Sequence, residues 1–123
     1  MLAVDFRKRV VRNFMDVLIL LEMQKDPMTG YGVMVYLQKK FGTSFSSGTV
    51  YGVLYAMERK ELIEGFWDGQ KRLFKPSGKG LNEAAVLLKA HKPLQDLLRE
   101  SEQAMAEYRI PVKEAEMQHT KNG

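Results

Sequence analysis

Cysteine is absent from the sequence, and histidine occurs only twice, as His91 and His119. The absence of cysteine excludes a disulfide framework, a thiolate metal site and a cysteine nucleophile. The two histidines lie far apart, and no serine or carboxylate stands with either of them in the order of a catalytic triad. The glycine-containing stretches lack the other residues of a phosphate loop or a dinucleotide motif. We therefore expect no enzyme activity, no catalytic residue, no metal site and no cofactor.

A long apolar run is also missing. The strongest one covers residues 14–23 and is interrupted by Asp16 and Glu22, whereas a membrane-spanning helix needs roughly 20 apolar residues. The charges near the start are followed by an apolar stretch, but no small-residue cleavage site of a signal peptide closes it. We therefore expect a soluble, cytoplasmic protein with no membrane partner.

Neither sign of charge is in large excess, because 19 basic and 15 acidic residues leave a net charge of +4. Their distribution is uneven: residues 1–80 contain 13 basic and 8 acidic side chains, whereas residues 81–123 contain 6 and 7. A basic first part and a nearly neutral remainder fit a polyanion-binding domain joined to an assembly element. Chance explains a difference of this size as well, so charge alone does not identify the partner.

Apolar spacing and capping residues predict two helices in the first third of the chain. One covers residues 5–25 and ends before Pro27, because the residue before a proline avoids the helical conformation. The other covers residues 30–41, with Thr29 as N-cap and Gly42 as C-cap. The expected apolar face of the first helix consists of Val10, Phe14, Val17, Leu18, Leu21 and Met23.

A third helix and a hairpin are predicted in the middle of the chain. The helix covers residues 48–60, and both Ser46 and Ser47 are competent N-caps. Two strand-like runs, residues 63–67 and 72–75, then flank an Asp-Gly-Gln segment. An Asp-Gly turn between such runs is typical of a β-hairpin.

Ser77 is the expected N-cap of the last helical stretch, and residues 81–110 of this stretch are the expected dimerisation element. Pro93 lies inside this stretch, where a proline must kink a helix or divide it. Residues 111–123 are polar and are expected to form a flexible tail. The order of elements predicts a mainly α fold with a small β-hairpin: a winged helix-turn-helix over residues 1–80, followed by a C-terminal helical dimerisation element.

The middle of the chain also contains a long, ordered set of motifs: GYG at 30–32, SGTVY at 47–51, MER at 57–59, LIEG at 62–65, and Trp67 ahead of the second strand. With these motifs, residues 14–80 resemble the PadR family of winged-helix regulators and its small archaeal relatives. Pro76 and Gly52 depart from the family pattern, which often has proline at the position of Gly52. The resemblance implies a DNA-binding transcriptional regulator, and in some relatives a small-molecule effector.

The helix over residues 48–60 is the expected recognition helix, with Gly52, Tyr55 and Arg59 on its outward face. Arg59 could read guanine bidentately, and Tyr55 could bind a phosphate or pack on a thymine methyl group. Packing at a protein interface is the alternative for Tyr55. An exposed helical glycine costs about 1 kcal/mol relative to alanine. Close approach of the backbone to DNA would explain Gly52, and a tolerated surface glycine explains it equally well.

Further contacts are expected around this helix. Ser46, Ser47 and Thr49 lie at its N-terminus, where free N–H groups and the helix dipole favour a phosphate. Capping alone accounts for one of the two serines. Lys60 lies on the flank of the helix. The resemblance implies that the Tyr51 hydroxyl reaches a phosphate, and packing at the edge of the core is the alternative.

The hairpin and the first helix carry the remaining basic clusters. Lys71, Arg72 and Lys75 form a basic wing that could contact phosphates or the minor groove. The alternative is a solvated edge hairpin that its lysines protect from aggregation. A second cluster could touch flanking phosphates, be a solvated face, or pair with acids of a partner subunit: Arg7, Lys8, Arg9 and Arg12.

The last helix has more apolar surface than one small domain can cover, so we expect it to bury this surface against a second copy of the chain. The predicted dimer interface consists of Leu81, Ala85, Leu88, Leu94, Leu98 and Met105.

Together these observations predict a homodimer that binds double-stranded DNA sequence-specifically and regulates transcription, as a repressor. The recognition helix would lie in the major groove and the wing on phosphates or the minor groove. The alternative is an architectural, chromatin or protein-interaction module without sequence-specific readout, and an RNA-binding winged helix is a third hypothesis.

Overall fold

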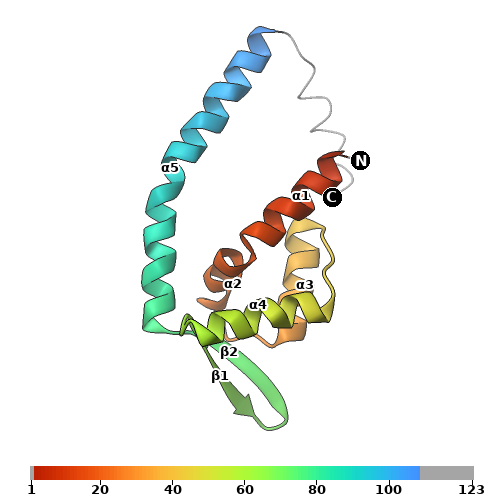
Figure 1. Ribbon diagram of the computed structural model, residues 1–123, viewed down its shortest axis with the longest axis vertical. Coiled ribbons are helices and arrows are strands. Elements are labelled where there is room, and N and C mark those ends of the chain that lie inside the picture. Colours follow the sequence, from red (N-terminus) through yellow and green to blue (C-terminus); the bar gives the residue numbers. More distant parts are fainter. Residues whose placement is uncertain (1, 109–123) are drawn as a thin grey trace. The chain divides into compact units, whose positions relative to one another are not determined.

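The computed structural model describes residues 2–108, so the predicted tail over residues 111–123 lies outside the described part, as does His119. The described residues divide into two compact units, with the division between Val86 and Leu87. Five helices and a two-stranded antiparallel sheet are described (Figure 1), which confirms the predicted mainly α fold with a small hairpin. The elements are α1 (Leu2–Asn13), α2 (Met15–Met23), α3 (Gly30–Phe41), α4 (Ser47–Arg59), β1 (Ile63–Asp68), β2 (Lys71–Pro76) and α5 (Gly78–Glu107).

The single helix predicted over residues 5–25 is wrong, because Phe14 separates α1 from α2. Its backbone angles, φ −107° and ψ 17°, are not helical. The buried face is also different: Val11 and Met15 are buried, whereas Val10 and Phe14 are exposed. Most positions between residues 14 and 23 are apolar, so the periodicity does not select one face of the helix. The exposed side of α1 is therefore more apolar than the sequence pattern indicated.

Both predicted helices in the middle of the first unit are confirmed, with their caps. The Thr29 side chain accepts a hydrogen bond from the backbone N of Gly32. Gly42, with φ +66°, ends α3 in the left-handed conformation that glycine adopts most readily. At the start of α4 the N-cap is Ser46, whose side chain accepts a bond from the backbone N of Thr49. Ser47 is the first residue of the helix.

The hairpin is confirmed with a small difference at its turn. Asp68 pairs with Lys71, so the loop contains Gly69 and Gln70 alone. Gly69 has φ +62°, and a positive-φ glycine at the first of two loop residues is typical of a type II′ turn. The turn thus lies one residue further along than an Asp-Gly turn would.

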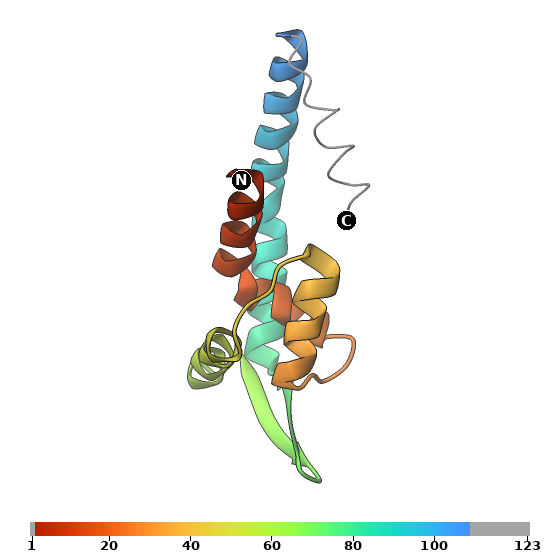
Figure 2. The ribbon, with the colours of Figure 1, turned by 90° about the vertical axis from the view of Figure 1, so that its right-hand side faces the viewer.

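The side chains of α2, α3, α4 and the hairpin form one hydrophobic core. Figure 2 shows how the backbones of these elements are arranged. Phe74 of β2 is completely buried in the core. The backbone of Phe74 also pairs with that of Met28 in an isolated β-bridge, which ties the hairpin to the segment before α3. The inner face of α4, with Val50, Leu54 and Met57, is buried in this core, and the other face of the helix is exposed to solvent. The neighbouring elements contribute further buried residues: Ile19, Leu20, Val33, Leu37, Leu62 and Ile63.

The start of α5 packs directly on the segment that follows α4. Ser77 is its cap, as predicted, and its Oγ accepts a hydrogen bond from the backbone N of Gly80 at 3.0 Å. A Cβ atom at Gly80 would lie 2.0 Å from the carbonyl oxygen of Leu62, so only glycine allows this approach. Ala84, one turn later, is buried.

Helix α5 begins at Gly78, directly after its predicted cap Ser77, and continues through Pro93 without a break. Pro93 therefore does not divide the helix. From Ala85 to Tyr108 every residue is exposed except Asp96, which is half-buried. Among the helices of residues 2–108, none combines the length and the apolar character needed to cross a membrane.

Candidate nucleic-acid interface

The outward face of α4 carries most of the residues predicted to contact DNA. Gly52, Tyr55 and Arg59 are all exposed, and Tyr55 has 47% of its surface accessible. Apart from its two chain neighbours and the backbone of its own helix, no atom lies within 4 Å of a Cβ built on Gly52. The backbone of α4 is therefore open to a close approach at this point. Lys60, at the C-terminal end of the helix, is also exposed.

Three hydroxyl side chains lie at the N-terminus of α4, and they differ in whether they take part in the helix cap or face solvent: Ser46, Ser47 and Thr49. Ser46 Oγ accepts from the backbone N of Thr49 at 3.1 Å and lies 3.0 Å from the Thr49 hydroxyl. Ser47 has no hydrogen bond from its side chain to the described residues, and it is exposed. Ser47 is thus the hydroxyl most available to an external group.

Tyr51 belongs partly to the core. Its ring lies over Gly30, where a Cβ atom would come within 2.2 Å of Tyr51 Cζ. On the other side it packs on Tyr55, with ring centroids 5.8 Å apart. The glycine of the GYG motif therefore makes room for this tyrosine. Packing thus accounts for two of the motif positions, Gly30 and Tyr51.

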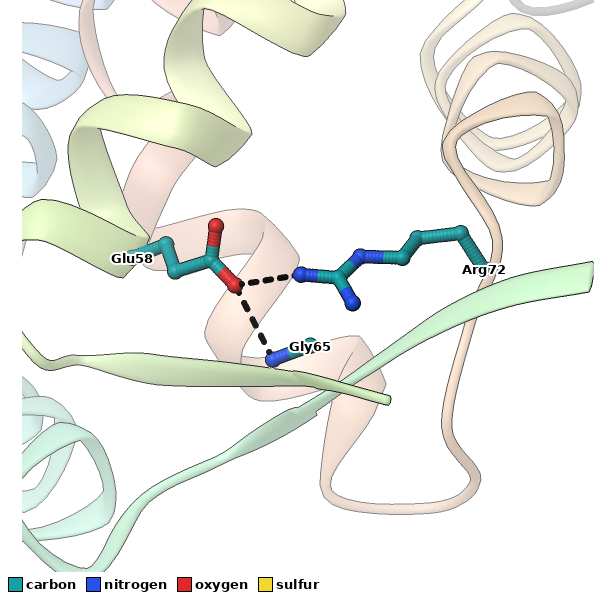
Figure 3. Close-up of polar contacts among 3 residues, drawn as sticks. All are labelled: Glu58, Gly65 and Arg72. Carbon is teal, nitrogen blue, oxygen red and sulfur yellow. Dashed lines mark hydrogen bonds and ion pairs between the residues drawn. The ribbon is translucent and has the colours of Figure 1, made fainter. Parts of the chain in front are cut away.

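The wing hairpin is attached to α4 by Glu58 (Figure 3). Its Oε2 atom accepts a hydrogen bond from Arg72 Nη2 at 3.0 Å and another from the backbone N of Gly65 at 3.2 Å. The Arg72 and Glu58 side chains are each about one-third exposed. A Cβ on Gly65 would lie 2.5 Å from Arg72 Nη2 and 2.6 Å from Glu58 Oε2. Sequence reasoning did not identify Glu58, because its partner is 14 residues away on another element.

The register of the hairpin separates its cations into two groups. Lys71 and Lys75 alternate with Arg72 along β2, so they lie on the opposite face of the hairpin from the Glu58 pair. Both lysines are exposed, and Lys75 Nζ lies 5.6 Å from the centroid of the Phe66 ring. Lys79, just beyond the strand, donates to the carbonyl oxygen of Lys60 at 3.0 Å.

The basic cluster of α1 lies beside the start of α4. Lys8, Arg9 and Arg12 border a groove of about 930 Å³ whose apolar lining includes Phe6, Phe14 and Phe45. Arg12 also lines a second groove, together with Gly48, Gly52 and Lys60 of the recognition helix. The structure thus brings Arg12 next to the outward face of α4, which the sequence left open.

The residues predicted for dimerisation lie along α5 as a series of exposed side chains. Leu81, Leu88, Leu94, Leu98 and Met105 are between 42% and 56% exposed, and Ala85 is exposed as well. Other exposed apolar side chains accompany them that the prediction did not include: Val86, Leu87, Leu97 and Tyr108. Within residues 2–108 no group of three or more acidic or histidine side chains is placed to hold a metal ion.

Comparison with known proteins identifies this arrangement. Residues 17–76, which contain α2 to β2, match the family described as the transcriptional regulator PadR-like family. No curated protein matches the sequence of the chain.

Solved structures share the fold at low sequence identity. A PadR-like transcriptional regulator from Bacillus cereus has a TM-score of 0.70 and 22% identity over 77% of this chain and 97% of its own. A transcriptional regulator from Clostridium thermocellum has a TM-score of 0.68 and 14% identity over 75% of this chain and 93% of its own. Bacillus subtilis PadR in complex with operator DNA has a TM-score of 0.52 and 18% identity over 60% of this chain and 46% of its own.

These likenesses confirm the winged-helix fold, with α4 as the helix that precedes the wing. Over residues 17–76, its winged-helix part, the chain belongs to the PadR-like family of transcriptional regulators.

Proposed function

We propose that the protein is a homodimeric repressor of transcription that binds double-stranded DNA sequence-specifically, with α4 in the major groove and the wing on phosphates or the minor groove. The observation that carries this proposal is the two-sided character of α4. One face is buried in the core, and the other exposes Tyr55, Arg59 and the bare backbone of Gly52. Bacillus subtilis PadR, which shares the fold, was solved in complex with operator DNA, and this supports the assignment.

The exposed residues of α4 take different roles in this proposal. Arg59 reads a guanine, because its guanidinium matches the O6 and N7 acceptors in the major groove. Tyr55 contacts a phosphate or a thymine methyl group one turn earlier. Ser47 binds a phosphate at the helix N-terminus, where the N–H groups and the dipole favour an anion, while Ser46 and Thr49 hold the cap. Tyr51 and Lys60 add contacts at the edges of this surface.

The basic residues of the wing have two different roles: some bind phosphates, and one positions the hairpin. Lys71 and Lys75 bind phosphates, because both are exposed and neither has an acidic partner among the described residues. Arg72 acts mainly as a positioning residue, since its guanidinium is already paired with Glu58. Arg12 of α1, beside Gly52, extends the phosphate contacts on the side of α4 away from the wing.

Dimerisation would use the exposed apolar side chains of α5, with residues 1–80 as the DNA-binding domain and residues 81–110 as the dimerisation element. Leucines left half in solvent along one helix are covered most simply by a second copy of that helix. Helix α1 supports the same proposal, because its side chains Leu2 and Phe6 are apolar, exposed and surrounded by basic residues. The end of α5 carries charge of the opposite sign, from Glu100, Glu102 and Glu107.

A titration by fluorescence anisotropy tests the proposal. Labelled duplexes from the region upstream of the protein's own gene and of scrambled sequence are compared at two salt concentrations, for wild type and Arg59→Ala. Tighter binding to the upstream duplex, with a preference that Arg59→Ala reduces, is the expected result. Equal affinity for both duplexes with a steep salt dependence would instead identify an architectural DNA-binding protein. No binding by the folded protein to either duplex would reject the assignment.

A further inference from the structure

Trp67 is the only tryptophan of the chain, and the fold leaves it 65% exposed near the end of the wing. It lies in β1 directly opposite Arg72, and only the pair of Asp68 and Lys71 separates it from the turn. Because side chains alternate along a strand, Trp67 and Gly65 share one face of the hairpin. This is the face that α4 holds, because a Cβ on Gly65 would lie 2.6 Å from Glu58 Oε2 and Arg72, opposite Trp67, donates to the same oxygen.

The indole is held in place from the recognition helix through two contacts in series. The guanidinium carbon of Arg72 lies 5.4 Å from the centroid of the Trp67 ring, within the range of a cation–π contact. The same guanidinium donates to Glu58 of α4 at 3.0 Å. Arg72 therefore links the position of the wing aromatic to the helix expected to read the DNA. A side chain fixed before binding loses less conformational freedom when it makes its contact.

The surroundings of the indole favour a polyanion with apolar walls. Arg72 lies across the strand pair on the same face as the indole, whereas exposed Lys71 and Asp68, the one acid in the turn region, form the next pair and lie on the other face of the hairpin. Duplex DNA presents deoxyribose edges between two rows of phosphates, so an exposed aromatic plate near the tip of a wing, with Lys71 on its opposite face, matches the wall of the minor groove. Apolar side chains inserted or packed in this groove are a recurring mode of DNA binding.

We propose that Trp67 is a DNA-contacting residue, whose indole packs against the deoxyribose edges of the minor groove beside the site read by α4. In this arrangement Arg72 orients the indole and does not serve as a phosphate ligand. The inference rests on the proposed DNA-binding function and adds an apolar contact to it. It also explains why a large apolar side chain remains in solvent on a hairpin otherwise rich in charge.

The single tryptophan provides a direct experiment on the full-length protein. Intrinsic fluorescence and acrylamide quenching are measured with and without the unlabelled upstream duplex, while anisotropy of a labelled duplex measures binding separately. DNA should change the emission and protect the indole from acrylamide. Trp67→Leu should reduce affinity about 10-fold, within the range found for aromatic contacts with nucleotides. Trp67→Phe should retain most of the affinity.

Phe66→Leu is the matched control, because Phe66 is the neighbouring aromatic residue on the other face of the same strand. It should leave affinity nearly unchanged, with thermal unfolding of all variants followed by circular dichroism. Glu58→Gln should make the indole of the free protein more accessible to acrylamide, since it releases Arg72.

The results separate the inference from the function on which it rests. If wild type binds the upstream duplex but acrylamide still reaches Trp67 fully and Trp67→Leu binds equally well, the inference is overturned and the proposed function stands. If the folded wild type binds no DNA, both are overturned. Protection of Trp67 by self-association alone, without any effect of DNA, would make it a protein contact and would also overturn the inference.

Discussion

Glu58 of the recognition helix and Arg72 of the wing are joined at 3.0 Å, and the same Glu58 oxygen accepts the backbone N–H of Gly65. One carboxylate thus fixes the angle between the two elements expected to contact DNA. The pair is about one-third exposed, so its contribution to stability is small, in the range of about 0–1 kcal/mol. Its main effect should therefore be on the geometry of the binding surface.

Glu58→Gln separates this geometry from stability. The amide oxygen can still accept from Gly65, but the ion pair with Arg72 is lost. We expect the free energy of unfolding in urea to fall by less than about 1 kcal/mol, and affinity for the upstream duplex to fall by about 1 kcal/mol, or roughly fivefold. Glu64→Gln is the control, because it removes the same charge from the opposite, exposed side of the hairpin. Equal affinities of the two variants would show that the Glu58 pair does not position the wing.

Gly80→Ala should destabilise the protein because of one backbone contact. The added Cβ would lie 2.0 Å from the carbonyl oxygen of Leu62, and neither backbone segment can move without disturbing the start of α5. Overpacking of this kind costs about 1–3 kcal/mol. Gly78→Ala, two residues earlier, meets no atom within 4 Å and should be neutral or slightly stabilising. Urea unfolding curves measure both, and equal midpoints would contradict the close approach.

Gly52→Ala should change stability and DNA binding in opposite directions. An alanine at this open helical position should raise the free energy of unfolding by up to about 1 kcal/mol. The methyl group would stand on the outward face of α4 and separate its backbone from the groove floor, so affinity for the upstream duplex should fall. Urea unfolding and anisotropy are the two measurements. A more stable variant with unchanged affinity would identify Gly52 as a tolerated surface glycine.

The parts of the fold that were predicted correctly depend on chemistry within a few residues. Thr29, Gly42 and Ser77 act on the ends of their own helices, and the hairpin follows from a turn between two short strands. Phe14 was placed wrongly because most residues from 14 to 23 are apolar, so the buried face is chosen by packing with α4 and β2. Helical spacing alone does not contain that information.

In the candidate site, too, some features follow from the local sequence and others depend on the tertiary fold. The outward positions Tyr55 and Arg59 follow from the periodicity of one helix, and the structure leaves both exposed. The pairing of Glu58 with Arg72 and the packing of Tyr51 on Gly30 join separate elements, so they depend on the tertiary fold. Arg72 was predicted as a phosphate ligand because a sequence shows the charge of a residue but not its partner.

Leu94→Glu combined with Leu98→Glu tests the proposed dimer. The two leucines are one turn apart on α5 and are 52% and 56% exposed. Two carboxylates in an apolar interface would be desolvated without partners, so the molar mass from light scattering should fall to that of one chain. Gln95→Glu, on the same helix, is the control for added charge and should leave the mass unchanged.

The same double variant also reveals how DNA binding depends on assembly. Two recognition helices held about 34 Å apart bind successive major grooves together, and losing this linkage should lower affinity by at least about 100-fold. Circular dichroism should show that the variant remains helical. A wild-type mass of one chain would reject the homodimer. A monomeric double variant with wild-type affinity would assign recognition to a single winged helix, and α5 would then serve an interaction that DNA binding does not require.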